Sequence, residues 1–501
     1  MLSLPQSQSV LAFFSYFKSL SKKVFLVYMD ISYSYYDVYQ HSVRIYAWLK
    51  KNRCRRLMFS ITNSPLSVSL FLASWMNDNN SYPVNPRFVS TELLLLIKRV
   101  KPDVFVLESH QFSSAIKLYC QQRNIKLVIV NDFNDFLNSL QEEFHSLSVP
   151  KFSIEDTLQK SVTYHISSGT DGRHKMHGHS VLQILFYAYR RQFDCGLRSG
   201  FISLNYLSFN HAYAFSYQLL PNIALGNTIV LGSKFTPASC IYLIKQHDIN
   251  AIALLPIMYY HLCQKLLKLL PFFHSLKHLS VAGDQPDQSL IFLVKRTLCL
   301  PLLNGVGMTE VYGYTQNLQP LSICNETQVF YDTKLMIKPL QLDNNIELCS
   351  TTLAHKHSVG QILLHSPMLP FGHKDYWMKT GDYGYYSRNR HTLFFLGRIK
   401  NIIVKGGSNI SPFEIEYYLS QFNFIEQVAI VGKKNSIWGQ LVCACIVTTH
   451  NKKIALQDMN NFLHRYVASY KHIDHIFQYE KLPTLPSGKI NRLQLLKDIS
   501  V

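Results

Sequence analysis

The stretch YHISSGTDGRHK at residues 164–175 combines hydroxyl side chains, two glycines and a lysine directly after an apolar run. Glycines let backbone N–H groups approach a polyphosphate closely, hydroxyls donate hydrogen bonds, and Lys175 adds a positive charge. The stretch therefore predicts a phosphate-binding loop, although the composition is also typical of a polar surface loop. It is not a Walker loop: counted from Gly169, that motif needs glycine and a hydroxyl residue where His174 and Met176 stand.

Segments further along the chain favour the phosphate-binding interpretation. In NGVGMTE at 304–310, a tight glycine turn precedes Thr309 and Glu310, a hydroxyl and a carboxylate that could hold Mg²⁺ beside a nucleotide. In TGD at 380–382, Asp382 could accept hydrogen bonds from two ribose hydroxyls. Two longer segments follow, GRIKNIIVKGGSNISPFEIE at 397–416 and LPTLPSGKI at 482–490. Each segment alone is a weak signal for nucleotide binding, but the order and spacing of all of them together are a strong signal for it.

With these segments in this order, the chain resembles the adenylate-forming superfamily of acyl-CoA and aryl-CoA synthetases, luciferase-like enzymes and peptide-synthetase adenylation domains. The resemblance runs from about residue 32 to about residue 496 and includes YSYYD at 33–37 and YPVNP at 82–86. It implies an α/β fold. A large N-terminal domain of packed mixed sheets with helices would span residues 1–396, and a small mobile C-terminal α+β domain would span 397–501.

Apolar periodicity agrees with such a fold. Short apolar runs separated by helical patterns predict strands of parallel sheets at 57–61, 104–107, 127–130, 201–204, 228–231 and 251–255. A further strand at 401–404 would open the small domain.

Length and composition bound the class of protein. The 501 residues exceed a single core, and 47% hydrophobic content excludes a disordered chain. A net charge of +19 fits a nucleic acid, an anionic membrane or an acidic protein partner, or only a lysine-rich composition in a protein that handles phosphates. We expect no nucleic-acid partner, because no basic run with interleaved aromatics is present.

The ten cysteines show no C-x-x-C pairing, which favours a reduced, cytoplasmic protein. We expect neither a signal peptide nor a transmembrane segment.

The resemblance implies a reaction and assigns roles to residues. A carboxylate attacks the α-phosphate of ATP, pyrophosphate leaves, and catalysis comes chiefly from positioning and charge neutralisation. Thr309 and Glu310 would lie at the α-phosphate, with Glu310 on Mg²⁺, while Asp382 and Arg398 would bind the ribose. The remaining nucleotide-binding residues implied are Ser167, Ser168, Gly169, Thr170, Gly172, Lys175, Gly307 and Met308.

Three features of the C-terminal region carry further implied roles. Lys489 matches the lysine that reaches the acid carboxylate and the α-phosphate during adenylation, where a fixed charge accelerates the reaction. Lys400 matches the hinge about which relatives rotate the small domain. The loop containing Lys405, Gly406 and Gly407 would then approach the active site and admit a pantetheine arm. An exposed lysine without a role remains the alternative for Lys489 and Lys400.

The chain departs from the family pattern at several positions. Asp171, His174 and Met176 replace threonine, proline and glycine of the phosphate loop, and Val306 replaces the aromatic residue that stacks on adenine. Asn401 stands where aspartate is usual. These changes keep open a catalytically impaired relative that binds nucleotide or acyl-adenylate as a sensor or scaffold.

The acid pocket indicates the class of substrate. FNHA at 209–212 lacks the aspartate with which peptide-synthetase domains bind an α-ammonium group, so an apolar or aryl carboxylic acid is favoured over an amino acid. His211 could contact the carboxylate, gate the pocket or simply be a core histidine. The acceptor thiol would belong to CoA or an acyl carrier protein. His179 is excluded as the family's histidine after the phosphate loop, because the spacing is too short. The pocket residues implied are His211, Tyr213, Gly283, Asp284, Gly305 and Val306.

Overall fold

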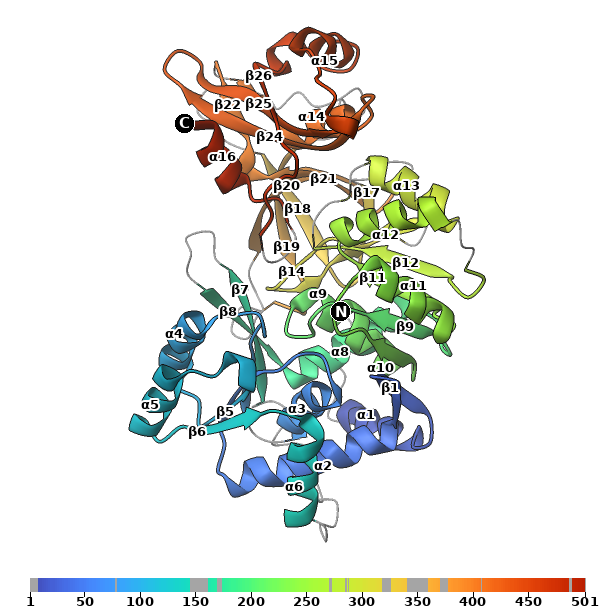
Figure 1. Cartoon of the computed structure of the whole chain (residues 1–501), viewed down its shortest axis with the longest axis vertical. Helices are drawn as coiled ribbons and strands as arrows, with labels where there is room; N and C mark the ends of the chain where they lie inside the picture. Colours follow the sequence, from blue (N-terminus) through green and yellow to red (C-terminus); the bar gives the residue numbers. More distant parts are fainter. Residues whose placement is uncertain are drawn as a thin grey trace.

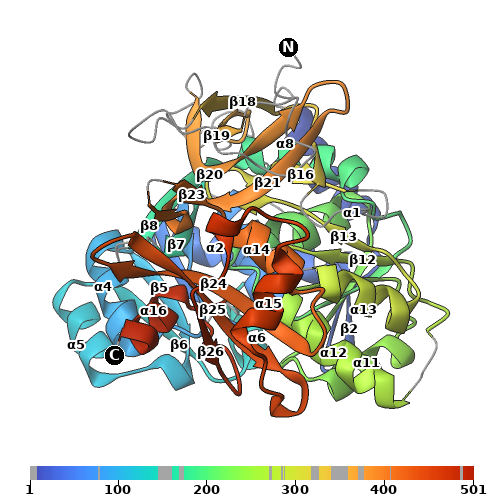
Figure 2. The same ribbon diagram turned by 90° about the horizontal axis from the view of Figure 1, so that it is seen from above.

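The computed structural model describes residues 8–76, 79–144, 161–168, 174–269, 273–283, 286, 288–317, 326–339, 359–369, 377–406, 408–485 and 489–500. The chain forms a large N-terminal domain and a small C-terminal domain, as the resemblance implied (Figure 1). The C-terminal elements occupy one end of the long axis. Seen from that end, they lie in front of both halves of the large domain (Figure 2).

A six-stranded sheet in the order β6-β5-β3-β4-β7-β8 forms the first half of the large domain. All neighbouring pairs are parallel except the β7–β8 hairpin, which is antiparallel. Helix α3 is apolar on every side and buried along its whole length, as expected for a core helix. The elements are α2 (Tyr35–Lys51), β3 (Arg56–Ser60), α3 (Pro65–Met76), β4 (Asn80–Pro83), α4 (Ser90–Val100), β5 (Val104–Glu108), η1 (Ser109–Gln111), α5 (Ser114–Gln122), β6 (Lys126–Val130), α6 (Phe133–Glu143), β7 (Val162–Ser168) and β8 (His174–Ser180).

A seven-stranded sheet in the order β13-β12-β11-β9-β10-β1-β2 forms the second half, with only β2 antiparallel. The predicted strands of both sheets are confirmed to within a residue or two. The elements are α1 (Gln8–Ser19), β1 (Val24–Tyr28), β2 (Ile31–Ser34), α8 (Val181–Asp194), β9 (Ile202–Asn205), α9 (Ala212–Ala214), η2 (Phe215–Leu219), α10 (Leu220–Ala224), β10 (Thr228–Leu231), α11 (Pro237–Gln246), β11 (Ala251–Leu254), α12 (Pro256–Leu269), β12 (His278–Val281), α13 (Gln288–Leu298) and β13 (Leu302–Asn304).

An antiparallel six-stranded sheet in the order β16-β17-β21-β20-β19-β18 completes the large domain, beside the short hairpin of β14 and β15. Glycines at 360 and 384 allow close strand approach, since a Cβ at either position would lie 2.2 Å from a carbonyl oxygen of the next strand. The elements are β14 (Gly307–Met308), β15 (Tyr312–Gly313), β16 (Thr315–Gln316), β17 (Glu326–Val329), β18 (Lys334–Pro339), β19 (Gly360–His365), β20 (Met378–Ser387) and β21 (Thr392–Arg398).

The small domain is a five-stranded sheet with helices, and it begins differently from our expectation. Asn401 lies in a 3₁₀ turn, so the strand predicted at 401–404 starts only at Ile403. The backbone N–H of Ile402 bonds to the Ile399 carbonyl, which closes this turn. The elements are η4 (Ile399–Asn401), β22 (Ile403–Lys405), β23 (Ser408–Ile410), α14 (Pro412–Leu419), β24 (Ile425–Asn435), β25 (Gly439–Thr448), η5 (Thr449–Asn451), α15 (Leu456–Leu463), η6 (Ser469–Lys471), β26 (His475–Gln478) and α16 (Arg492–Ser500).

Specific contacts hold the two domains together. The Tyr260 hydroxyl on α12 donates to Glu426 Oε2 on β24 at 2.9 Å, and Ser411 Oγ donates to the Leu396 carbonyl at 3.2 Å. Phe413 and Tyr417 of α14 pack against the core that covers the seven-stranded sheet. Among the described residues, no helix has the length and apolar character needed to cross a membrane.

Candidate active site

The paired ends of β7 and β8 carry the described residues of the predicted phosphate-binding segment. The register pairs Ser167 with Lys175 and Ser168 with His174, so both serines lie at the end of β7 beside the lysine strand. Gly169, Thr170 and Gly172 fall outside the described residues. The hydroxyl and lysine ends of the predicted phosphate site are therefore brought together, and its binding role stays a prediction.

The β14–β15 hairpin carries Thr309 and Glu310 in its turn. Gly307 must be glycine, because a Cβ there would lie 2.5 Å from the Tyr312 carbonyl oxygen. Tyr312 itself adopts a positive φ of 59°, which lets the chain reverse within three residues. Glu310 is partly exposed, and a hydroxyl and a carboxylate are oxygen donors that suit Mg²⁺.

His177, which the sequence did not single out, joins these two hairpins. Its Nε2 lies 2.9 Å from Ser167 Oγ and 3.5 Å from Glu310 Oε1. Desolvation lowers the pKa of the imidazole, the Glu310 carboxylate raises it, and Lys175 lowers it. The signal was the alternation of His177 and His179 on one face of a strand, two residues beyond Lys175.

His179 is a structural support of the same turn. Its Nε2 lies 2.9 Å from the Glu310 carbonyl oxygen and 3.1 Å from that of Met368, and its ring lies 4.3 Å from that of Tyr312. Burial lowers its pKa to about 4, so the ring is neutral near pH 7 and must carry its proton on Nε2 to serve carbonyl acceptors. His179 therefore fixes the Glu310 backbone.

Asp382 and Arg398 face each other across β20 and β21. Arg398 Nε lies 2.8 Å from Asp382 Oδ1, and Arg398 Nη1 donates to the Thr380 carbonyl at 3.2 Å. Gly381, at φ 76°, allows the turn. Burial raises the Asp382 pKa to about 6, Arg398 and Lys489 lower it, and Glu310 raises it. Asp382 is thus within electrostatic reach of the other predicted nucleotide-binding residues.

Lys489 of the small domain reaches this constellation. Its charge contributes to lowering the pKa of Asp382, of His211 and of the hinge candidate Lys400. The Leu485 N–H donates to the Lys489 carbonyl at 2.7 Å, and Thr484 forms a bridge with Ile490, which fixes the backbone on either side. A lysine more than 270 residues beyond His211 therefore lies within electrostatic reach of it.

The described residues of the predicted acid pocket come from separate loops and from helix α9. His211 remains accessible to solvent. Its pKa is nevertheless lowered by desolvation from the surrounding residues and by the positive charges of Lys489 and Arg87. Tyr213 follows it on α9, and Val306 packs at the edge of the main core. Gly283 adopts φ 88°, where a Cβ would meet Leu255 at 2.8 Å. Asp284 lies outside the described residues.

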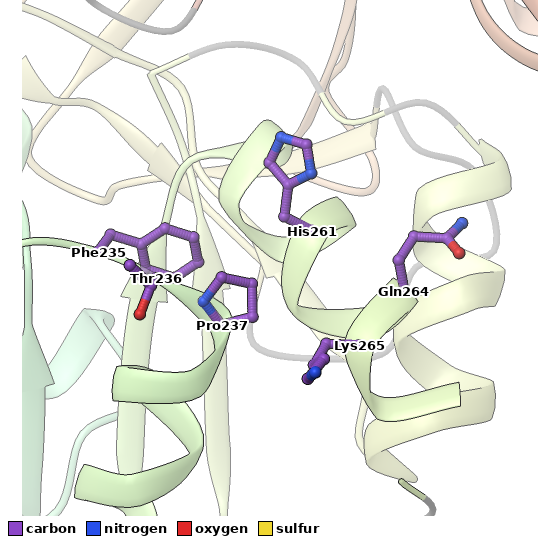
Figure 3. Close-up of a pocket in the computed structure, with 6 residues that line it drawn as sticks. All are labelled: Phe235, Thr236, Pro237, His261, Gln264 and Lys265. Atoms are coloured by element: carbon purple, nitrogen blue, oxygen red, sulfur yellow. The ribbon is translucent and has the colours of Figure 1, made fainter. Parts of the chain in front are cut away.

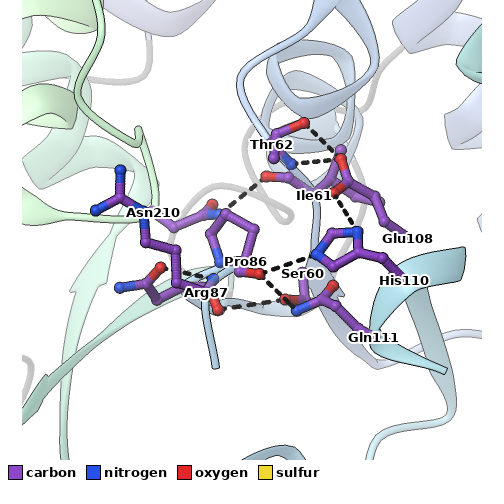
Figure 4. A network of polar contacts seen from close by, with 10 residues as sticks. Ser60, Ile61, Thr62, Pro86, Arg87, Glu108, His110, Gln111 and Asn210 are labelled. Atoms are coloured by element: carbon purple, nitrogen blue, oxygen red, sulfur yellow. Dashed lines mark hydrogen bonds and ion pairs between the residues drawn. The ribbon is translucent and has the colours of Figure 1, made fainter. Parts of the chain in front are cut away.

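Arg87 is a second residue that our sequence reasoning missed, although it directly follows the quoted segment 82–86. A polar network holds its loop (Figure 4). Gln111 Nε2 donates to the Pro86 carbonyl at 3.0 Å and to Ser60 Oγ at 2.8 Å, and Asn210 Nδ2 donates to the Ile61 carbonyl at 3.1 Å. The network fixes the loop that carries Arg87, whose charge contributes to lowering the His211 pKa.

The predicted thiol-acceptor loop is anchored within the small domain. Lys405 Nζ lies 2.7 Å from both carboxylate oxygens of Asp474, so its charge is already paired. Gly406 adopts φ 55°, and a Cβ there would lie 3.0 Å from the half-exposed Trp438 ring. Gly407 lies outside the described residues. The ion pair makes Lys405 a support of the loop.

A shallow cavity of about 540 Å³ lies elsewhere on the large domain (Figure 3). It separates the start of α11 from α12 and contains none of the predicted site residues. Its lining consists of Phe235, Thr236, Pro237, His261, Gln264 and Lys265.

Comparison with protein families decides the identity of the fold. The model of the AMP-binding enzyme family matches residues 15–368, and that of the AMP-binding enzyme C-terminal domain matches residues 414–489. This chain belongs to the AMP-binding enzyme family. The family membership that the motifs implied is thereby confirmed.

Individual relatives of this AMP-binding enzyme carry ligase names. The chain is 31% identical over 267 residues to the 2-succinylbenzoate–CoA ligase of Lactococcus lactis, which covers 52% of the chain and 54% of the relative. It is 22% identical over 500 residues to the 4-coumarate–CoA ligase of Vanilla planifolia, covering 93% and 88%. The match thus spans about half the length of the 2-succinylbenzoate–CoA ligases of Lactococcus lactis and Listeria monocytogenes.

Solved structures share the whole fold. ATP-bound MatB from Rhodopseudomonas palustris superposes with a TM-score of 0.83 at 16% identity, covering 97% of this chain and 98% of MatB. The o-succinylbenzoate CoA synthetase of Bacillus subtilis, in complex with its acyl-adenylate, superposes with a TM-score of 0.76 at 19% identity, covering 96% and 97%. At these identities the likeness establishes the fold.

Proposed function

We propose that this AMP-binding enzyme adenylates a carboxylic acid with MgATP and transfers the acyl group to CoA. The proposal is supported chiefly by Lys489 of the small domain, whose charge contributes to lowering the pKa of both His211 and Asp382 of the large domain. A positive charge within electrostatic reach of the predicted acid and ribose positions suits adenylation. The names of the ligase relatives support the same chemistry.

In the first step, a carboxylate oxygen of the acid bonds to the α-phosphorus while the bond to the pyrophosphate oxygen breaks. Lys489 would stabilise the charge on the reacting oxygens, and Ser167 and Lys175 would hold the departing phosphates. Asp382 would accept hydrogen bonds from the ribose hydroxyls. A bound Mg²⁺, held by Glu310 and Thr309, would neutralise phosphate charge.

In the second step, the thiol sulfur of CoA bonds to the acyl carbon, the thiol proton is lost, and AMP leaves. Rotation of the small domain about Lys400 would bring the Lys405-Gly406 loop to the site. The substrate class we favour is an apolar or aryl acid. An acyl carrier protein is the alternative acceptor.

Acid-dependent release of pyrophosphate tests the proposal. We expect Lys489→Ala to lower the rate by about 10²- to 10³-fold, because a preorganised charge is lost from the transition state. Lys453→Ala, an exposed lysine of the same domain, is the matched control and should change nothing. Acid-dependent release that is indifferent to Lys489 would remove that residue from the mechanism.

The alternative is a relative that only binds nucleotide or acyl-adenylate. Asp171, His174, Met176 and Val306 motivate it, because each departs from the family pattern at the phosphate loop or adenine site. It predicts thermal stabilisation by ATP without pyrophosphate release from any acid. The triple change Asp171→Thr, His174→Pro and Met176→Gly should then raise turnover.

A further inference from the structure

The helical segment that begins at His211 leads away from the reacting end of the acid pocket. His211 caps α9 and lies within the electrostatic reach of Lys489, which marks the carboxylate end. Tyr213 and Tyr217 follow one turn apart, and their ring centroids are 5.6 Å apart. Tyr217 belongs to a π-helical turn, a distortion that is frequent at functional sites. The two rings therefore form a short aromatic wall on the helical segment that follows His211.

This wall ends at Gly305, where oxygen atoms from strand β16 and from the helical segment converge. A Cβ built on Gly305 would lie 2.9 Å from Gln316 Oε1, 3.1 Å from the Thr315 carbonyl oxygen and 3.2 Å from the Tyr217 hydroxyl. Gly313 accommodates the Tyr217 ring from the other side, since a Cβ there would lie 2.0 Å from the same hydroxyl. The glycines thus leave three oxygens gathered around one small surface.

The polar atoms around Gly305 include an acceptor that has no hydrogen-bond donor. The Tyr217 hydroxyl donates to the Thr315 carbonyl at 2.8 Å, which uses its only proton. Burial raises the Tyr217 pKa well above its usual value, so the hydroxyl does not ionise. Gln316 is 3% exposed, and its Oε1 is buried without a hydrogen-bond donor. A buried carbonyl oxygen without a donor pays a desolvation penalty that no hydrogen bond offsets. In this arrangement the surface at Gly305 presents acceptor oxygens, of which Gln316 Oε1 has no donor.

We propose that the cognate acid carries a hydroxyl or N–H group at the end remote from its carboxylate, and that Gln316 Oε1 accepts the hydrogen bond from this group. The inference rests on the proposed function, because it concerns the acid pocket of that reaction. Gln316 is then a specificity-determining residue, with the Tyr217 ring as the wall beside the polar group.

Matched pairs of acids test the proposal. Each pair has the same shape but differs in the donor, such as 4-hydroxycinnamate with 4-methylcinnamate, 4-hydroxybenzoate with 4-methylbenzoate, and ω-hydroxy acids with the alkanoates of equal length. For the pair of acids that the enzyme uses best, we expect kcat/KM for pyrophosphate release to be at least about 10-fold higher with the acid that carries the hydrogen-bond donor. The methoxy analogue, which only accepts, should behave like the methyl analogue.

Substitution assigns the preference to its residue. Gln316→Met keeps the volume and removes the acceptor, so the ratio within the pair should fall to near one while the KM for ATP is unchanged. Gln316→Glu keeps an acceptor and should preserve the preference. Gln328→Met, at an exposed position of the neighbouring strand, is the control.

Equal use of both members by the wild type, or a preference that survives Gln316→Met, would overturn the proposal while leaving adenylation intact. If no acid releases pyrophosphate, the proposed function has failed instead. Calorimetric binding of the same pairs then decides the inference: tighter binding of the donor member, lost in Gln316→Met, supports it, and equal or absent binding overturns it.

Discussion

The imidazole of His177 lies against the carboxylate of Glu310, with Nε2 3.5 Å from Oε1, and the same nitrogen lies 2.9 Å from Ser167 Oγ. One side chain thus links the phosphate-loop hairpin to the turn that carries the predicted metal ligand. The link positions two predicted nucleotide-binding groups before ATP arrives.

We predict that His177→Leu raises the KM for MgATP about 2- to 10-fold, because the lost hydrogen bond to Ser167 Oγ contributes about 0.5–1.5 kcal/mol to the positioning of this turn. His177→Gln, which retains polar atoms near the same position, should recover part of the loss. Steady-state kinetics with varied MgATP measures both. An unchanged KM in His177→Leu, with only lower thermal stability, would make His177 purely structural.

Asp382 predicts a pH dependence of nucleotide binding. Its pKa is raised to about 6, so the carboxylate that would accept the ribose hydroxyls becomes neutral as the pH falls through 6. We expect ATP affinity to decline below this pH and to be level above about pH 7. Asp382→Asn should bind more weakly and flatten the profile. Calorimetric titration between pH 5 and pH 8 measures this, and an identical profile in the variant would contradict it.

The same raised pKa fixes the sign of a stability effect. The native state binds the Asp382 proton more tightly than the unfolded chain, whose aspartates titrate near pH 3.9. The contribution of this group to the free energy of unfolding therefore decreases as the pH rises from about 4 to about 6. Denaturant unfolding of wild type and Asp382→Asn should diverge in this window, with the wild type losing relative stability toward the higher pH.

Substitution of Gly313 by alanine should cause a steric clash within the predicted acid pocket. In Gly313→Ala, the new Cβ would overlap the Tyr217 ring, so this ring must move from the pocket wall. We expect kcat/KM for the acid to fall at least about 10-fold, in line with the losses that small misplacements in a site cause. Gly200→Ala is the control, because a Cβ there meets no atom within 4 Å, so its φ of 86° adds backbone strain without a clash. Equal effects of the two changes on the acid would refute the steric account.

A buried ion pair in the small domain should contribute to the stability of that domain against unfolding. Lys471 Nζ contacts both carboxylate oxygens of Glu414, at 2.9 and 2.7 Å, and the two side chains are 6% and 9% exposed. Lys471→Met leaves the Glu414 charge buried with this partner removed and should destabilise the domain by about 3–5 kcal/mol. The double variant with Glu414→Gln should recover most of the loss in thermal unfolding. A double variant as unstable as the single one would contradict this reason.

The chemistry-bearing segments could be predicted from the sequence because their residue types depend on local backbone demands. Gly307 is needed where two strands of a tight hairpin touch, and Gly381 adopts a positive φ. These backbone requirements can be recognised in the sequence, because each glycine stands one to three positions before a hydroxyl or carboxylate residue of the same motif. The strand pattern was readable for the same reason, since continuous apolar runs are typical of buried parallel strands.

Only the tertiary structure decided which side chains meet. His177 contacts Glu310 across 133 positions of the chain, Lys405 is paired with Asp474, and Gln316 Oε1 is left without a donor at Gly305. Each depends on how separate strands and hairpins pack, and local propensity carries no information about such pairs. The sequence by itself thus determined the family and the residues available for chemistry. The packing of the sheets and of the small domain determined which of them lie near Lys489 and which are fully engaged elsewhere.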